Sequence, residues 1–170
     1  TDIKPKDGGS GPVWDMVAGV VAGESLSLNQ VEHEKIRLTW NEPAIHASIV
    51  CASASCPNLR QEAFVGSKVR FQMDEQMKSW LANPTKGLKV DTANAEVVLS
   101  RIFLWFDKDF GSDRLEYVSR YVDPKLQEAI SNNKLKIRFF NYDWQLTRAS
   151  PSSLSTSKQE KASSSSVETS

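Results

Sequence analysis

The chain lacks several features that would place it in a broad functional class. Positive and negative charges balance, with 21 Lys+Arg against 21 Asp+Glu, and no run of five like charges occurs. This balance argues against the basic surface that is typical of proteins that bind nucleic acid or anionic membranes. No uninterrupted apolar run approaches the roughly 20 residues that a membrane-spanning helix requires. The sequence therefore predicts a soluble chain with no nucleic-acid partner and no membrane-spanning segment.

Cysteine is scarce, because Cys51 and Cys56 are the only two in 170 residues. Two cysteines are too few for a disulfide scaffold. Their separation by four residues suits a local disulfide, a metal clip or a reactive thiol, and the spacing alone leaves all three open. A signal peptide is also missing from the visible start, which carries a Gly- and Pro-rich cluster instead of a charged and then apolar stretch.

Length and composition predict one α+β domain, because 170 residues with 39% hydrophobic content can bury one sizeable core. Helical and strand-like segments alternate without the regular order of a doubly wound sheet, which favours a small sheet with several helices. We expect the domain at 13–148, after a flexible segment at 1–12. The Ser-rich tail at 149–170 cannot bury enough apolar surface to offset its ordering entropy and is expected to be disordered.

Capping signals and apolar spacing predict the helices. Ser27 and Gln30 have the spacing of a capping box, and Asp123 before Pro124 is a typical helix start. Period-two alternation predicts a strand near residues 135–140, and the turn-prone residues 91–94 predict a hairpin. The expected helices lie at 27–38, 67–81, 100–111, 113–122 and 124–132, and the expected strands at 13–23, 44–51, 88–90, 97–99 and 135–140.

The β-branched run Ala44–Cys51 predicts a central strand that carries His46, since it is apolar and of strand length. Alternation along this strand would turn Cys51 toward the core and His46 to the opposite face, which disfavours a direct pairing of the two. Cys56 would then lie exposed in the polar loop that follows. We therefore expect Cys56 to be the more reactive thiol.

Several motifs follow one another in a recognisable order. They are SLSLNQVEH (25–33), IHASIVCASASCPNL (45–59), AF (63–64), LSRIFLWF (99–106), DF (109–110) and YDWQL (142–146). Together these motifs resemble the family catalogued as domain of unknown function 547, over roughly residues 14–147. The resemblance implies no established activity, although relatives in bacteria often look exported, so an exported or periplasmic location is one implication.

The resemblance also implies a missing element. Members of the family usually carry an upstream helix with an aromatic-Ile-Asn-Ala-Tyr-Asn-Ala type motif, and no such motif lies in residues 1–170. We expect this sequence to be the C-terminal part of the domain, with an apolar groove exposed near Glu32, His33 and His46. A distant similarity to papain-like and transglutaminase-like thiol hydrolases further implies a thiol nucleophile assisted by histidine.

Four residues are candidates for catalysis. Cys56 is the candidate nucleophile and His46 or His33 the candidate base, since a thiol needs a proton acceptor within reach to become a thiolate. Glu32 falls inside an otherwise apolar helical arc, where burial would raise the pKa of its carboxyl; such a carboxylate is either functional or a structural anchor. No cofactor is expected.

A metal site is the other chemical possibility. His33, His46, Cys51 and Cys56 are ligand types suited to tetrahedral zinc, but their spacing matches no known finger. Three functional readings stay open. The first is a module of unknown function whose working region surrounds His33, His46 and the Cys51–Cys56 loop; the second is a thiol-dependent hydrolase or transferase; the third is a noncatalytic module with structural cysteines that binds a protein partner.

Overall fold

The computed structural model describes residues 12–132 and 134–147, and its mixture of helices with two small sheets confirms the predicted α+β class. The flexible segment predicted at 1–12, apart from Pro12, and the disordered tail predicted at 149–170 lie outside the described residues. The helical elements are α1 (Pro12–Asp15), η1 (Gln30–Arg37), α2 (Leu38–Trp40), α3 (Ile45–Ser48), α4 (Val69–Leu81), α5 (Ile102–Trp105), η2 (Asp107–Phe110), α6 (Arg114–Ser119) and α7 (Pro124–Asn132). The strands are β1 (Val17–Val21), β2 (Glu24–Ser27), β3 (Leu88–Asp91), β4 (Glu96–Leu99) and β5 (Lys136–Phe139).

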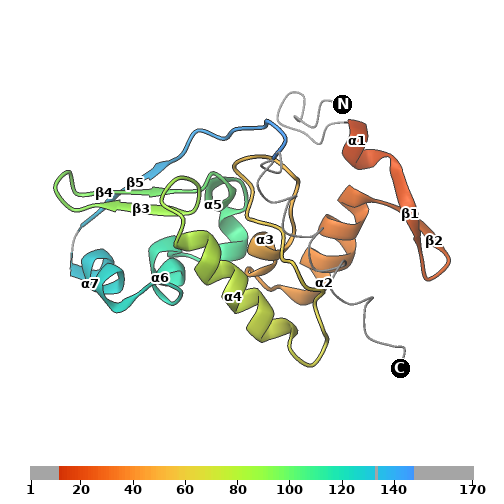
Figure 1. The fold of residues 1–170 in the computed structure, drawn as a ribbon, viewed down its shortest axis with the longest axis horizontal. Helices are drawn as coiled ribbons and strands as arrows, with labels where there is room; N and C mark the ends of the chain where they lie inside the picture. Colours follow the sequence, from red (N-terminus) through yellow and green to blue (C-terminus); the bar gives the residue numbers. More distant parts are fainter. Residues whose placement is uncertain (1–11, 133, 148–170) are drawn as a thin grey trace, which may run out of the picture.

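The larger sheet has the strand order β3-β4-β5 (Figure 1). Strands β3 and β4 form the predicted antiparallel hairpin, in which Leu88 pairs with Leu99. Strand β5 then runs parallel to β4, with Phe139 opposite Leu99. A parallel neighbour requires a crossover connection, and the helices α5, η2, α6 and α7 supply it. This crossover brings the segment after β5 back toward the middle of the molecule.

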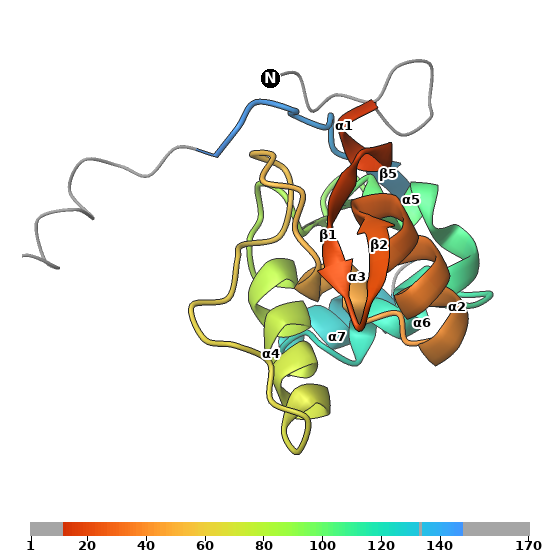
Figure 2. The same cartoon turned by 90° about the vertical axis from the view of Figure 1, so that its right-hand side faces the viewer.

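A second, two-stranded sheet, the β1–β2 hairpin, projects from the other end of the molecule (Figure 1) and faces the viewer in Figure 2. The predicted strand at 13–23 is confirmed for Val17–Val21, whereas Pro12–Asp15 is helical. The predicted capping box follows directly: the backbone N–H of Gln30 donates to Ser27 Oγ at 3.1 Å, and that of Ser27 donates to Gln30 Oε1 at 3.0 Å. The helix it starts, η1, is wound as a π-helix.

The core lies between α4, the larger sheet and the crossover helices. Met77 and Leu81 of α4 and Phe103 of α5 are each at most 1% exposed. This burial confirms the predicted apolar face of the helix at 67–81, although Val69 at its start is 37% exposed. Gly87 makes the close packing possible, since a Cβ built there would lie 1.9 Å from the backbone oxygen of Trp80.

The predicted aspartate caps are also confirmed. Asp113 accepts hydrogen bonds from the backbone of Leu115 and Glu116 at 2.8 and 3.0 Å, and α6 starts there. Asp123 accepts from the backbone of Lys125 and Leu126 at 2.9 and 3.1 Å, and α7 starts there. Among the described residues, no helix is long and apolar enough to cross a bilayer.

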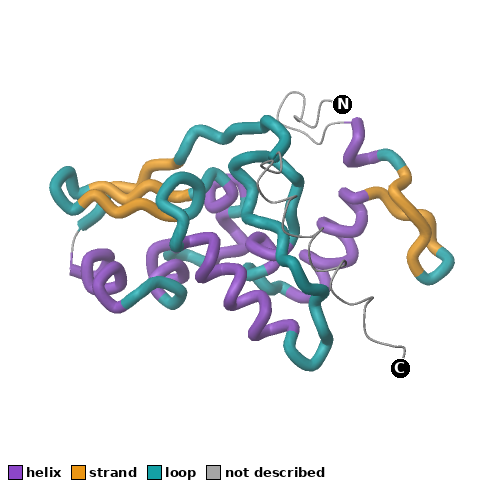
Figure 3. Tube along the Cα trace, in the orientation of Figure 1, coloured by secondary structure: helices purple, strands orange, loops and turns teal. Residues whose placement is uncertain are grey.

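The strand predicted at Ala44–Cys51 is wrong. Residues Ile45–Ser48 form the short helix α3, which is followed by an extended but unpaired stretch (Figure 3). Two features favour the helix. Glu42 Oε1 accepts from the backbone N–H of Ala44 at 3.0 Å, and Ala44 and Ala47, both fully buried, let α3 pack closely against α4. His46 therefore lies on a buried helical turn and not on a central strand.

Candidate functional site

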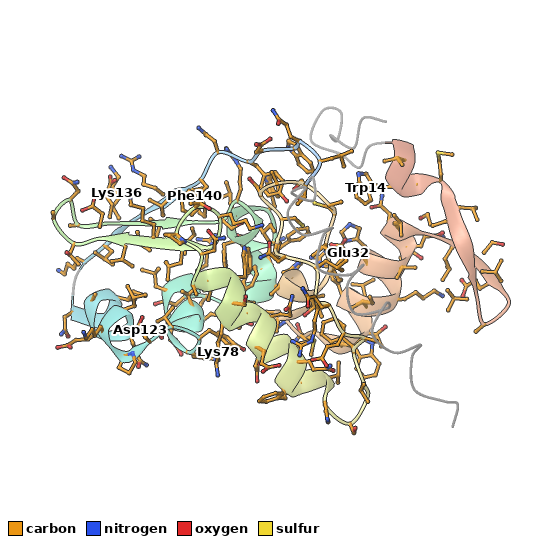
Figure 4. All side chains as sticks on the ribbon, in the orientation of Figure 1. Trp14, Glu32, Lys78, Asp123, Lys136 and Phe140 are labelled. Carbon is orange, nitrogen blue, oxygen red and sulfur yellow. The ribbon has the colours of Figure 1, made fainter. Side chains whose placement is uncertain are left out.

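One cavity contains all the residues that the sequence singled out. It has a volume of about 590 Å³. Figure 4 labels Trp14 and Glu32, two lining residues that come from α1 and η1. The wall opposite them is built from α3, the loop 51–59, α5 and the segment after β5. The predicted candidates that line the cavity are Glu32, His33, His46, Cys51 and Cys56.

The two cysteines form a close pair of free thiols. Their Sγ atoms lie 3.1 Å apart, and the backbone N–H of Cys51 also donates to Cys56 Sγ at 3.1 Å. The predicted exposures were wrong: Cys56 is only 4% exposed, whereas Cys51 is half-buried. The reason is the turn at residues 52–56, which begins with Ala52 at φ +62° and folds Cys56 back beneath Cys51.

The pair is electrostatically asymmetric. A hydrogen bond from Cys56 lowers the pKa of the Cys51 thiol to about 5, with further help from Ser53 and Tyr142, although burial acts in the opposite direction. The same contact with Cys51, together with burial, raises the pKa of the Cys56 thiol. When the pair holds a single proton, these opposite shifts favour the thiolate at Cys51 and the thiol at Cys56. A thiolate is the reactive form of cysteine.

The hydroxyl of Tyr142, oriented by that of Ser53, supports the Cys51 thiolate. The Ser53 hydroxyl donates to the Tyr142 hydroxyl oxygen at 3.1 Å, and the Tyr142 hydroxyl lies 3.5 Å from Cys51 Sγ. Ser53 Oγ itself is 3.3 Å from that sulfur. Because Ser53 uses its single proton on Tyr142, the proton of Tyr142 is free to point at the sulfur.

The segment that carries Tyr142 is fastened to the cysteine loop. The backbone N–H groups of Ala54 and Thr147 donate to the carbonyls of Gln145 and Ala52 at 2.8 and 2.9 Å. Figure 1 shows this segment reaching the loop after it leaves β5. These bonds hold the hydroxyl of Tyr142 in place beside the sulfur pair.

Lys86 fastens the loop from the other side. Its Nζ donates to the carbonyl oxygens of Cys56 and Ala54 at 2.7 and 3.3 Å and to Asn58 Oδ1 at 2.8 Å. An ammonium group has three donors, and all three are used here. The loop that presents the cysteines is therefore fixed at several points although it lacks regular secondary structure.

A second polar network lies on the histidine side of the cavity. Asp109 accepts a bidentate pair of bonds from Arg37 at 2.8 and 3.0 Å, and its Oδ2 lies 2.7 Å from His46 Nε2. The bonds from Arg37 lower the pKa of Asp109, so that this carboxylate stays ionised. It therefore accepts the proton of His46 Nε2, which leaves Nδ1 of the neutral ring as the basic nitrogen.

The two histidines are held in different ways. Burial lowers the pKa of His46, and the bond to Asp109 opposes this shift. His46 also stacks on Phe106, with ring centroids 4.3 Å apart. Nδ1 of His33 lies 2.8 Å from Arg37 Nη1, and because arginine only donates, the proton of the neutral His33 ring must be on Nε2.

Glu32 faces the cavity from η1. Burial raises the pKa of its carboxyl; His33 and Arg37 act against this, and the negative charges at Cys51 and Asp109 add to it. Among the described residues, no hydrogen bond or ion pair shorter than 4 Å joins this carboxyl to another side chain. Glu32 thus lines the cavity without a hydrogen-bonded or ion-paired side chain in the described part of the chain.

The structure offers no support for the zinc site considered above. Within residues 12–132 and 134–147, no group of three or more His, Cys, Asp or Glu side chains is arranged to hold a metal ion. His46 Nε2 is engaged by Asp109, and His33 Nδ1 faces Arg37. The four predicted ligands share the cavity but do not converge on one point.

Sequence reasoning missed part of the site. Neither Arg37 nor Asp109 was among the predicted site residues, although Asp109 belongs to one of the motifs above. The aromatic lining was also missed, because such residues are more often core than cavity wall. It consists of Trp14, Trp105, Phe106, Tyr142 and Trp144, of which all but Trp14 lie in the quoted motifs.

Taken together, the elements define an α+β protein with one cavity lined by a cysteine pair and by His46, whose ring bonds to Asp109. The family model described as "Protein of unknown function, DUF547" matches residues 10–81, so this part of the chain is similar to that family. The match confirms the resemblance seen in the motifs up to residue 81 and includes Glu32, His33, His46, Cys51 and Cys56. Neither the curated proteins nor the solved structures contain a significant match to the chain.

Proposed function

We propose that the cavity carries out thiol–disulfide exchange, with Cys51 as the attacking sulfur and Cys56 as the resolving sulfur. The observation that carries this proposal is the 3.1 Å separation of the two Sγ atoms, with the acidic Cys51 toward the cavity and Cys56 buried behind it. A buried thiol beside an accessible thiolate has the geometry that an intramolecular second step requires. The proposal replaces Cys56 by Cys51 as the nucleophile expected from the sequence.

The reaction proceeds in two displacements. The Cys51 thiolate attacks one sulfur of a substrate disulfide; the substrate S–S bond breaks, a mixed disulfide forms on Cys51, and one half of the substrate leaves as a thiolate. Cys56 then attacks Cys51 Sγ, which forms the Cys51–Cys56 disulfide and expels the other half. The proton of Cys56 passes to one of the released thiolates and the other takes a proton from water, so the protein is oxidised by two electrons and the substrate is reduced to two thiols.

The surroundings favour this order of events. While Cys51 is a thiolate, its charge raises the pKa of Cys56 and keeps it protonated. Formation of the mixed disulfide removes that charge, so the pKa of Cys56 must fall just when its thiolate is needed. The backbone N–H of Cys51, 3.1 Å from Cys56 Sγ, then stabilises the new thiolate.

The experiment compares the wild type with Cys56→Ser and Cys51→Ser, using an aromatic disulfide reagent whose released thiol is coloured. The wild type should release two thiols per chain and end without a bound adduct, because the internal disulfide forms. Cys56→Ser should release one and keep a stable adduct on Cys51, whereas Cys51→Ser should react slowly. Adducts on both cysteines of the wild type, or faster labelling of Cys56, would overturn the proposal.

A second candidate function is acyl transfer or hydrolysis by Cys51, with His46 as the proton acceptor. The observation that favours it is the contact between His46 Nε2 and Asp109 Oδ2, which orients an imidazole on the same cavity. This reaction needs His46 and not Cys56, so His46→Gln and Cys56→Ser should distinguish it from thiol–disulfide exchange. His46→Gln should abolish the formation of an acyl-enzyme from an activated ester and leave thiol–disulfide exchange active. Cys56→Ser should leave acyl-enzyme formation intact and stop exchange at the mixed disulfide on Cys51.

A further inference from the structure

We propose that the cavity binds ligands through an organic cation, such as an alkylated ammonium group, held between the aromatic wall and Glu32. The aromatic wall is defined here as Trp14, Trp105, Tyr142 and Trp144. The inference deepens the proposed function by naming a substrate class, and it rests on that function only for the reaction at Cys51. Cation binding itself requires no sulfur chemistry.

The first support is the geometry of the aromatic wall. The centroid of the Tyr142 ring lies 4.7 Å from that of Trp105 and 4.6 Å from that of Trp144, and the two tryptophan centroids are 5.8 Å apart. The Tyr142 ring is inclined by 55° and 51° to its two neighbours, while the two tryptophan rings are stacked at 25° to one another, so the wall presents two ring orientations. Trp105 is 43% exposed, although tryptophan is costly to leave in contact with water.

The second support is the charge of the cavity. None of the described residues that line it is lysine or arginine, whereas Glu32 and Cys51 both contribute acidic groups. Each nitrogen of the nearby Arg37 guanidinium already bonds to Asp109 or His33. A ligand with a positive charge would therefore supply the partner that Glu32 lacks among the described residues.

These two features select the same chemistry. The face of an indole or phenol ring carries partial negative charge and attracts cations, most strongly where water is excluded. Methyl or methylene groups on an ammonium also bury apolar surface against the rings, which a strongly hydrated bare ammonium does less well. A neutral ligand of the same shape would use only the apolar part of the site, and an anion would meet two like charges.

The position of Tyr142 connects binding with the proposed reaction. Its ring is part of the aromatic wall, and its hydroxyl lies 3.5 Å from Cys51 Sγ. A cation that contacts this ring is thus within a short distance of the reacting sulfur. The substrate class we infer is a disulfide that carries an ammonium group a few bonds away from its sulfur atoms.

The test measures calorimetric binding of choline and of its uncharged carbon isostere, 3,3-dimethylbutan-1-ol, to the reduced full chain. The two probes have the same shape and differ in charge. Choline should bind about tenfold more tightly, the size expected of a partly desolvated cation–aromatic contact. Equal affinity for the isostere, or no measurable binding of choline, would overturn the inference.

Two variants and one control locate the site. Glu32→Gln keeps the shape of the side chain and should reduce the preference for choline over the isostere. Trp144→Leu should lower the affinity for both probes. Trp40→Leu removes an exposed tryptophan of α2 that lies outside the cavity and should change neither affinity. An unchanged preference in Glu32→Gln would contradict the role of the carboxylate even if Trp144→Leu fails to fold.

The outcome is separable from that of the proposed function. Choline binding involves no bond to sulfur, so it can succeed although Cys51 fails to react with disulfides. Conversely, rapid exchange at Cys51 without a preference for choline would refute the ligand class and leave the exchange reaction standing. If both hold, Glu32→Gln should slow the reaction with cystamine, a diammonium disulfide, several-fold more than that with the uncharged 2-hydroxyethyl disulfide.

Discussion

Nε2 of His46 lies 2.7 Å from Oδ2 of Asp109, although 63 residues separate them in the sequence. The contact joins the buried helix α3 to η2 and turns the ring of His46 toward the cavity. Arg37 completes the arrangement by holding the same carboxylate, so three elements meet at one charged group. The arrangement has a measurable consequence for stability.

Stability should fall on mild acidification because of His46. Its pKa in the folded chain lies below the ordinary 6.5, so the unfolded chain binds a proton more readily. The stabilising contribution is therefore present above pH 6.5 and is lost as the pH falls through the lower, folded value. Between about pH 7 and pH 5, the free energy of urea unfolding should fall less for His46→Gln than for the wild type. If this free energy depends on pH with the same slope in both proteins, the pKa of His46 does not change on folding.

Tyr142→Phe should make Cys51 less acidic. The substitution removes the hydroxyl 3.5 Å from Cys51 Sγ and leaves the Ser53 hydroxyl without its acceptor. We expect the pKa of Cys51 to rise and the free energy of unfolding to drop by about 1 kcal/mol. The pH dependence of alkylation measures the first and urea unfolding the second; an unchanged alkylation profile would remove Tyr142 from the account of the thiolate.

Lys86→Met should loosen the cysteine loop. Three hydrogen bonds to Cys56, Ala54 and Asn58 disappear, and their acceptors must find water instead. The expected cost is about 1–3 kcal/mol, with faster hydrogen exchange in residues 52–58. Lys78→Met is the matched control, since Lys78 is an exposed residue of α4 (Figure 4) and its replacement should have little effect. Equal behaviour of the two variants would contradict the role of Lys86.

Gly87→Ala should be strongly destabilising. Its Cβ would lie 1.9 Å from the backbone oxygen of Trp80, so either the α4 end or the start of β3 must move. A cost of about 3 kcal/mol or more is expected, at the upper end for overpacking. Gly66→Ala is the control, because nothing lies within 4 Å of the added Cβ. A thermal midpoint lowered equally in both variants would indicate a general effect of losing glycine.

The parts of the fold that the sequence predicted are those decided by short-range chemistry. Ser27 with Gln30, Asp113 and Asp123 each cap a helix through neighbours two or three residues away, and such patterns are visible in a sequence. The β3–β4 hairpin follows from its turn in the same way. Parallel pairing of β5 with β4 was not predicted, because it depends on the path of the whole crossover between them.

The failure at residues 44–51 has a local and a long-range cause. Ile49 and Val50 gave the segment its strand-like composition, but they follow the helical turn and stand in an extended stretch without a strand partner. The turn itself is favoured by the packing of Ala44 and Ala47 against α4, a contact between distant parts of the chain. Propensity is a weak guide where tertiary packing decides.

The candidate site was found in outline because its residue types are chemically unusual in their contexts. Glu32, His33, His46 and the two cysteines do line one cavity, although their roles remain proposals. The sequence could not show which thiol is acidic, since that depends on a backbone turn at Ala52 and on a hydroxyl 91 residues away from Cys51. For Asp109, the only indication in the sequence was its place in the DF motif (109–110).

The central claim is that Cys51 is the reactive thiolate of the pair. The most direct test is the rate of iodoacetamide alkylation of each cysteine as a function of pH, read by peptide mass in the reduced wild-type chain. Cys51 should be labelled first, at a rate that is half-maximal near pH 5, where its pKa lies, and is constant at neutral pH. A rate at Cys51 that still rises through about pH 8.5, as for an ordinary thiol, or preferential labelling of Cys56, would contradict the account.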